Sequence, residues 1–155
     1  KLFNARPIAV AASDEKLALA QRLGAEYVIN RKTQDVYDEV RRITDRRGVD
    51  IAFEHPGEAT WAQSLRCVRW GGTIVTSGAT AGYEATTDLR HIFFRQLNVL
   101  GSTLGSKAEL MEAWRHVISG QIRPVVSQVL PLSEAPRAQS IMESDEVVGK
   151  IVLMP

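Results

Sequence analysis

The sequence predicts an α/β fold with a doubly wound, Rossmann-type parallel sheet, and two observations support this class. Short apolar runs that read as strands alternate with amphipathic stretches that read as helices between residues 6 and 103. The apolar runs are continuous, as in strands that helices cover on both faces. This alternation predicts parallel pairing through right-handed crossovers, with ligands at the carboxyl ends of the strands.

The first two strands flank a helix with clear start and stop signals. A strand is predicted over 6–13, where an apolar run follows a proline. The helix over 14–25 has Ser13 as a suitable N-cap and Gly24 as its stop. The second strand follows over 26–30.

The next helix and strand lead to the most informative stretch, DIAFEHPG at residues 50–57. The helix is predicted over 33–48, with Gly48 as its stop and with an apolar face made of Val36, Val40 and Ile43. The strand over 49–55 then ends in an acid, an imidazole, a proline and a glycine. These polar and turn-forming residues lie where a parallel sheet binds its ligand.

A third helix is predicted over 59–72, with Cys67 as a core residue. Its buried stripe is formed by Trp61, Leu65 and Val68. A strand over 73–78, a short helix near 88–96 and a strand over 98–103 complete this part of the chain.

The character of the chain changes after Gly105. The remaining predicted elements are a helix over 106–121, a strand over 123–132, a helix over 133–144 that begins at Ser133, and a closing strand over 149–155. The first of these helices has an expected buried stripe of Leu110, Trp114 and Val117. The chain is therefore divided into a part over 1–104 and a part over 105–155.

Composition limits the classes of partner. The formal net charge is +1, which gives no reason to expect nucleic acid or an anionic membrane as a partner. The arginines at 41, 42, 46 and 47 are interpreted as the solvated face of a helix. No transmembrane run or signal peptide is recognisable. The single cysteine and the lack of zinc-ligand spacing favour a reducing, cytoplasmic location.

One expected feature of a dinucleotide-binding fold is not found. Such a fold starts with a central strand, a glycine-rich turn and a helix whose N-terminus holds the pyrophosphate. No glycines here have that spacing, and the usual strand order would place the absent strand between those over 6–13 and 49–55. The sequence is interpreted as the C-terminal part of a longer polypeptide. The alternative is a complete protein with a different strand order.

Several blocks together resemble the medium-chain dehydrogenase/reductase superfamily, in its zinc-type alcohol dehydrogenase and quinone reductase branches. They are AVAASDEKLALAQRLGAEYVIN, GVDIAFEHPG, GGTIVTSGATAGY, LRHIFFRQLNVLGSTLGS and GKIVLMP. The resemblance implies hydride transfer with NAD(H) or NADP(H), a partial Rossmann domain over 1–104, and a segment over 105–155 that returns to a GroES-like catalytic domain. Two of the blocks also look like crotonyl-CoA carboxylase/reductases, which we retain as an alternative.

The resemblance implies NADP(H) in preference to NAD(H). Ala11 stands where NAD-preferring members carry an acid for the ribose hydroxyl. Ser13 and Lys16, at the start of a helix, suit a phosphate. The competing interpretation is that Ser13 is only an N-cap and Lys16 only a surface charge, and the acids at 14 and 15 oppose a phosphate.

Further cofactor contacts are implied at the strand ends and in the tail. The implied residues are His55, Pro56, Gly57, Ser77, Gly78, Ala79, Thr103, Leu104 and Lys150. Each has a structural alternative: a polar strand end at residue 55, ordinary strand-to-loop exits at 77–79 and 103–104, and an edge charge at residue 150. Glu54 is interpreted as structural. No catalytic residue or metal ligand is identified, and any catalytic zinc would be bound outside this chain.

Two further expectations concern assembly and activity. The strand over 98–103 is expected to pair with its mate in a second subunit, so we expect a homo-oligomer. The chain alone is expected to be inactive. The alternative to an oxidoreductase is a non-catalytic module that binds nucleotide or only assembles with partners.

Overall fold

A computed structural model describes residues 2–144 and 147–155 and confirms an α/β fold with parallel strands. The strands are β1 (Ile8–Ala11), β2 (Tyr27–Asn30), β3 (Val49–Glu54), β4 (Val68–Thr76), β5 (Asn98–Gly101), β6 (Val126–Pro131) and β7 (Lys150–Met154). The helices are α1 (Asp14–Leu23), α2 (Val36–Ile43), α3 (Trp61–Cys67), α4 (Leu89–Phe93), α5 (Lys107–Ile118) and α6 (Ala135–Glu143), and a 3₁₀ turn, η1, covers Leu132–Glu134.

The strands form three separate parallel sheets: β1 with β2, β3 with β4 and β5, and β6 with β7. In the described part of the chain, no ladder joins β1 to β3. This is the position where the usual strand order places a further strand. Along β3, Ile51 and Phe53 remain 63% and 71% exposed, so the expected cover on both faces is not provided by this chain.

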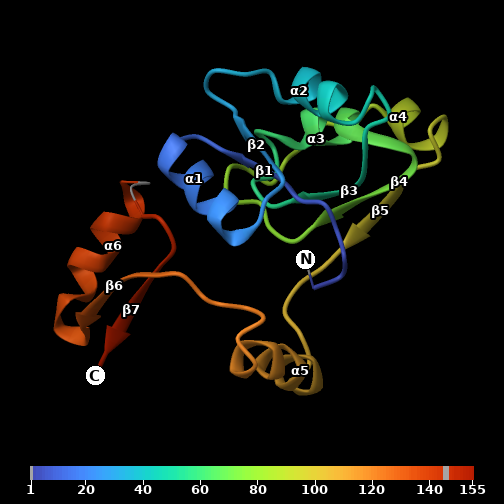
Figure 1. Ribbon diagram of the computed structural model, residues 1–155. Coiled ribbons are helices and arrows are strands. Elements are labelled where there is room, and N and C mark those ends of the chain that lie inside the picture. The colour runs from blue at the N-terminus through green and yellow to red at the C-terminus, as the bar shows by residue number, and fades with distance from the viewer. Residues whose placement is uncertain (1, 145–146) are drawn as a thin grey trace.

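Two apolar clusters join the helices to the first two sheets. One cluster contains the buried residues Leu65, Val68, Ile74 and Leu97. The other contains Ile29, Val40 and Cys67, so the predicted burial of Cys67 is confirmed. Val49 of β3 packs against both clusters. Figure 1 shows α2, α3 and α4 on one side of the strands and α1 on the other.

The ends of α1 match the prediction, but two later boundaries were wrong. Ser13 caps α1 and Gly24 ends it. The second helix begins at Val36 and ends at Ile43, well short of Gly48. The predicted third helix stops at Cys67, because Val68 pairs with Val49 of β3; the register then shifts, and pairing resumes at Thr73 opposite Ile51. Pairing with a neighbouring strand overrides helical periodicity at Val68, a β-branched residue that favours strands.

Two expectations for the C-terminal part were also wrong. The expected buried stripe of α5 is largely exposed, with Leu110 at 58% and Trp114 at 50%, because no other element of the described chain covers it. Ser133 does not cap a helix; it lies in the 3₁₀ turn, and α6 begins after Glu134. Figure 1 shows β6, β7 and α6 as a unit of their own, connected to β5 through α5.

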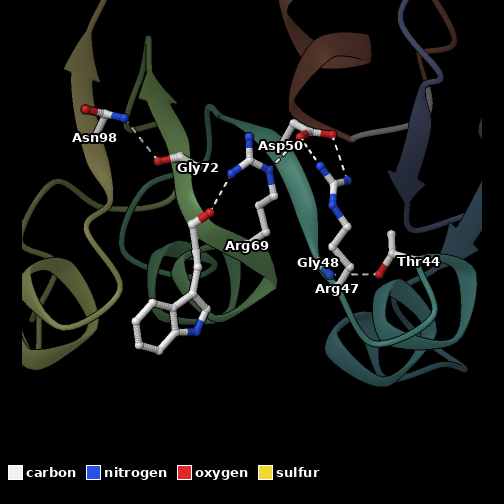
Figure 2. A network of polar contacts seen from close by, with 8 residues as sticks. Thr44, Arg47, Gly48, Asp50, Arg69, Gly72 and Asn98 are labelled. Carbon is white, nitrogen blue, oxygen red and sulfur yellow. Dashed lines mark hydrogen bonds and ion pairs between the residues drawn. The ribbon is translucent and has the colours of Figure 1, made fainter.

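An ion-pair network lies at the start of β3. Figure 2 shows Asp50 between Arg47 and Arg69, whose guanidinium nitrogens lie 2.5 and 2.6 Å from its carboxylate. Nearby, the Gly48 N–H donates to Thr44 Oγ1 at 2.9 Å, which connects the end of the α2 segment to the strand. Hydrogen bonds from Arg47 and then Arg69 lower the pKa of Asp50 to about 2.

We predict that Asp50→Asn lowers stability only slightly and in a pH-dependent way. The Asp50 side chain is 56% exposed, so solvent screening limits the loss at pH 7 to below about 1 kcal/mol. A depressed native pKa stabilises the fold above the unfolded pKa, and this contribution disappears as pH falls through the native value. The stability difference between the two proteins should therefore be constant above about pH 5, fall as the pH decreases, and vanish at about pH 1. Urea unfolding at several pH values measures it, and a difference that grows on acidification would contradict the prediction.

Candidate functional site

The carboxyl ends of β3 and β4 meet in two interlocked turns. The Ser77 N–H donates to the Glu54 carbonyl at 3.1 Å, and the Ala81 N–H donates to the Pro56 carbonyl at 2.8 Å. The Glu58 N–H in turn donates to the Gly82 carbonyl at 2.9 Å. Two predicted segments, 55–57 and 77–79, are thus brought together at one edge of the sheet.

Glu54 organises this edge from inside the protein. Its side chain is only 2% exposed and is the one buried charged group among the described residues. One carboxylate oxygen accepts from the Gly57 N–H at 3.0 Å and from the Thr60 hydroxyl at 2.7 Å, while the other accepts from the Ser64 hydroxyl. These three donors fix the turn after β3 and the start of α3, so the structural interpretation of Glu54 agrees with the geometry.

The glycines of the two turns are packed by the protein itself. Gly57 has φ +86°, and a Cβ there would lie 2.4 Å from the Gly82 carbonyl oxygen. A Cβ on Gly78 would lie 2.4 Å from Nδ1 of His55. The space where each glycine lacks a side chain is therefore filled by the protein: by the opposite turn at Gly57 and by the His55 ring at Gly78.

Backbone donors nevertheless remain available at this edge. The N–H groups of Gly78 and Ala79 have no hydrogen-bond partner among the described residues, and Ala79 is exposed. Two adjacent N–H groups without partners at the carboxyl end of a parallel strand suit a ligand carbonyl or carboxamide. This donor set fits the nicotinamide side of a dinucleotide.

Comparison with known proteins gives the family. Residues 1–119 match the family profile described as zinc-binding dehydrogenase. The chain belongs to the zinc-binding dehydrogenase family. This places it in the medium-chain dehydrogenase/reductase superfamily, as the sequence blocks predicted.

Individual relatives of the chain differ in activity. A crotonyl-CoA reductase of Streptomyces avermitilis is 32% identical over 96% of this chain and 37% of its own length. An NAD-dependent alcohol dehydrogenase of Saccharolobus solfataricus is 30% identical over 96% and 43%. The chain thus spans about 40% of the length of the curated relatives it matches.

Solved structures have the same fold. A crystal structure of an NAD-dependent alcohol dehydrogenase gives a TM-score of 0.93 at 42% identity, over 99% of this chain and 45% of that one. A 2-octenoyl-CoA carboxylase reductase solved with NADP and 2-octenoyl-CoA gives 0.84 at 32% identity, over 97% and 38%.

The remaining predicted residues of the chain lie at three other places. Ser13 accepts from the Lys16 N–H at 3.4 Å, beyond the end of β1, so its capping role is real. Thr103 and Leu104 follow β5, and Leu104 is 99% exposed with φ +44°. Lys150 begins β7, and in the described part of the chain no hydrogen bond or ion pair connects its side chain to the β3–β5 edge.

Sequence reasoning missed two residues of this edge, Thr60 and Ser64. Both hydroxyls bind the Glu54 carboxylate, one before and one within α3. Their four-residue spacing puts them on one helix face, which was the available signal. The sequence does not reveal their role, because a Thr or Ser hydroxyl can bind many partners and the buried carboxylate it meets here is set by the tertiary fold.

Neither a metal-binding cluster nor a membrane-spanning helix is found among the described residues. Across residues 2–144 and 147–155, no three His, Cys, Asp or Glu side chains are arranged to hold a metal ion. No described helix is both long and apolar enough to cross a membrane.

Proposed function

We propose that the protein carrying this chain is an NAD(P)-dependent oxidoreductase that transfers hydride between nicotinamide and a carbonyl, an alcohol or an activated alkene. The observation that carries the proposal is the edge at the carboxyl ends of β3 and β4, where the turns at 55–57 and 77–79 interlock and two N–H groups remain without partners. Family membership and relatives with this class of activity support it.

The proposed roles combine this geometry with the family resemblance. Gly78 and Ala79 donate to the carboxamide of the nicotinamide, and His55 and Pro56 contact the adenosine side, with Thr103 and Leu104 bordering the nicotinamide. When bound, the cofactor supplies or accepts the hydride. The chain holds and orients it, and Glu54 acts only by fixing the turns that do so. We also propose that Lys150 reaches a cofactor phosphate in the whole protein.

The test is a cofactor titration of the longest native polypeptide that contains residues 1–155. Tight binding of NADPH or NADH, followed by hydride transfer to one of the three substrate classes, is the expected result. Absence of binding to both dinucleotides in a folded protein would overturn the proposal and favour a non-catalytic module.

We further propose a preference for NADP(H), and it gives a specific prediction. Ala11→Asp places a carboxylate at the end of β1, where it would repel a 2′-phosphate and accept hydrogen bonds from a ribose hydroxyl. We expect NADPH affinity to fall about 10–100-fold while NADH affinity stays level or rises. Fluorescence titration of both cofactors measures this. Ala18→Asp on α1 is the matched control for adding a charge elsewhere, and an equal loss for both cofactors would contradict the prediction.

Enoyl-CoA reduction is a second candidate, and a specific finding favours it. The crotonyl-CoA reductase is 32% identical to this chain, and a related structure contains NADP together with an enoyl-CoA. Parallel assays with crotonyl-CoA, a simple alcohol and a quinone separate the candidates. Turnover of the thioester alone would select this one.

Assembly and location complete the proposal. All four residues of β5 are exposed, and Leu100 is 53% accessible. Such an apolar edge strand suits pairing with the same strand of a second subunit. Sedimentation analysis would then show a dimer or a larger species. We place the protein in a reducing cytoplasm, with domain limits at 1–104 and 105–155, and assign any catalytic zinc to ligands outside this chain.

A further inference from the structure

A cluster of polar and charged side chains lies at the opposite edge of the β3–β5 sheet. A cavity of about 270 Å³ is present there, at the amino ends of the strands. Its lining contains Tyr37, Cys67 and Trp70 together with many arginines. Those arginines are Arg41, Arg46, Arg47, Arg66, Arg69 and Arg95. Because β3 has six residues and rises about 3.3 Å per residue, roughly 20 Å separates this cavity from the candidate cofactor edge.

Most of the positive charge in this cavity is not balanced. Arg47 and Arg69 share the single carboxylate of Asp50. Among the described residues, no carboxylate forms an ion pair with the other four lining arginines. An adjoining cavity of about 330 Å³ shares two of these arginines and adds Arg42 and one acid, Asp38. A cluster of unpaired guanidinium groups this close is repulsive unless an anion joins it.

Several of these guanidinium groups are held in place before any anion binds. Arg41 and Arg66 lie 5.5 and 4.2 Å from the centre of the same Tyr37 ring, and Arg41 donates to its hydroxyl at 2.9 Å. Arg95 donates to the carbonyl oxygens of Leu65 and Arg66, and partial burial lowers its pKa. A guanidinium anchored through a ring or a carbonyl loses little freedom on binding an anion.

The backbone before the cavity is strained. Asp45 and Arg46 follow α2 with φ +49° and +67°, a left-handed conformation that is unfavourable for two consecutive non-glycine residues. This turn brings the chain from α2 to β3 and places Arg46 in the cavity lining. Strain of about 1–3 kcal/mol per residue tends to persist where a ligand site requires it.

We propose that this cavity binds a diphosphate or another small anion with several phosphate charges. Planar guanidinium groups bind phosphate oxygens in pairs, and several of them surround one small space here. The volume lies below the range of about 300–1,000 Å³ common for larger ligands, so a compact anion fits better than a whole dinucleotide. A long nucleic acid would need a more extensive basic surface, and the chain's net charge is only +1.

The experiment is a calorimetric titration of pyrophosphate into the longest native polypeptide that contains residues 1–155, at constant ionic strength. Titration of ADP in parallel distinguishes a free diphosphate from the diphosphate of a nucleotide. We expect saturable binding that is unchanged by excess NADPH, because the two sites lie at opposite edges. Arg46→Gln and Arg66→Gln should each weaken it at least tenfold, and Arg66→Lys should give an intermediate affinity.

Arg22→Gln is the matched control, because Arg22 is exposed on α1 and outside the cavity. It should leave pyrophosphate affinity unchanged. Arg46 is also exposed, so its replacement should not disturb folding, and circular dichroism checks this. Three results would overturn the proposal: equal losses in Arg22→Gln and Arg46→Gln, displacement of pyrophosphate by NADPH, or binding only to an extended polymer such as polyglutamate or RNA. Equal losses in the two variants or binding only to a polymer would leave the proposed cofactor site untouched, whereas displacement by NADPH would itself show that the protein binds the cofactor.

Discussion

Replacement of Glu54 by alanine is expected to destabilise the protein by about 3–5 kcal/mol. The carboxylate is 2% exposed and accepts three hydrogen bonds. Its removal leaves the Thr60 and Ser64 hydroxyls and the Gly57 N–H without their acceptor inside the protein. It also leaves a cavity at the start of α3. Urea unfolding of the longest native polypeptide that carries this chain measures the loss.

Two companion variants sharpen this prediction. Glu84→Ala removes an exposed acid from the loop after β4 and should change stability by less than about 0.5 kcal/mol. Glu54→Gln keeps the shape and one acceptor, so we expect a smaller loss of about 1–2 kcal/mol. If the two alanine variants unfold at the same urea concentration, the carboxylate does not organise this edge.

Gly57→Ala is expected to destabilise the protein by about 2–4 kcal/mol and to weaken cofactor binding. The residue has φ +86°, and a Cβ would lie 2.4 Å from the Gly82 carbonyl oxygen and 3.0 Å from the Ala79 Cα. These contacts are with backbone, which cannot move aside as a flexible side chain can. The turn at 79–82 must shift, and the shift moves the N–H groups proposed to meet the nicotinamide.

Gly105→Ala is the matched control for this substitution. A Cβ at Gly105 would meet only the Glu109 side chain, at 3.6 and 3.7 Å, which is ordinary contact. Its thermal unfolding midpoint and NADPH affinity should stay close to those of the unchanged protein. An alanine at residue 57 that lowers neither stability nor NADPH affinity would show that the two turns are not coupled in the way described.

The two turns also explain why DIAFEHPG ends as it does. Glu54 points inward to hold the turn, His55 packs against Gly78, and Gly57 permits the approach of the loop from β4. The sequence indicated that these residues lie at a ligand edge. It could not indicate that the chain itself fills much of the space the glycines leave, because that depends on residues more than twenty positions away.

Local patterns predicted the elements well where a local interaction stabilises them. The cap at Ser13 and the stop at Gly24 are contacts within a few residues, and both are present. The helical pattern at 59–72 failed after Cys67 because strand pairing with β3, a long-range contact, decides the conformation of Val68. The local helical pattern over 33–48 also assigned the arginines at 46 and 47 to a helix face, yet both lie beyond the end of α2.

The sequence by itself therefore determined the order of strands and helices, the parallel class of the sheet, the family and the burial of Cys67. The order of elements, the parallel class and the burial of Cys67 follow from periodicity, capping and apolar content, which act over short distances along the chain, whereas the family follows from the resemblance of whole sequence blocks. The tertiary structure alone decided which groups satisfy Glu54, which arginines gather at the amino edge, and that the apolar stripe of α5 stays exposed. Each of these depends on which distant segments meet, and a free energy of contact between distant segments cannot be read from either segment alone.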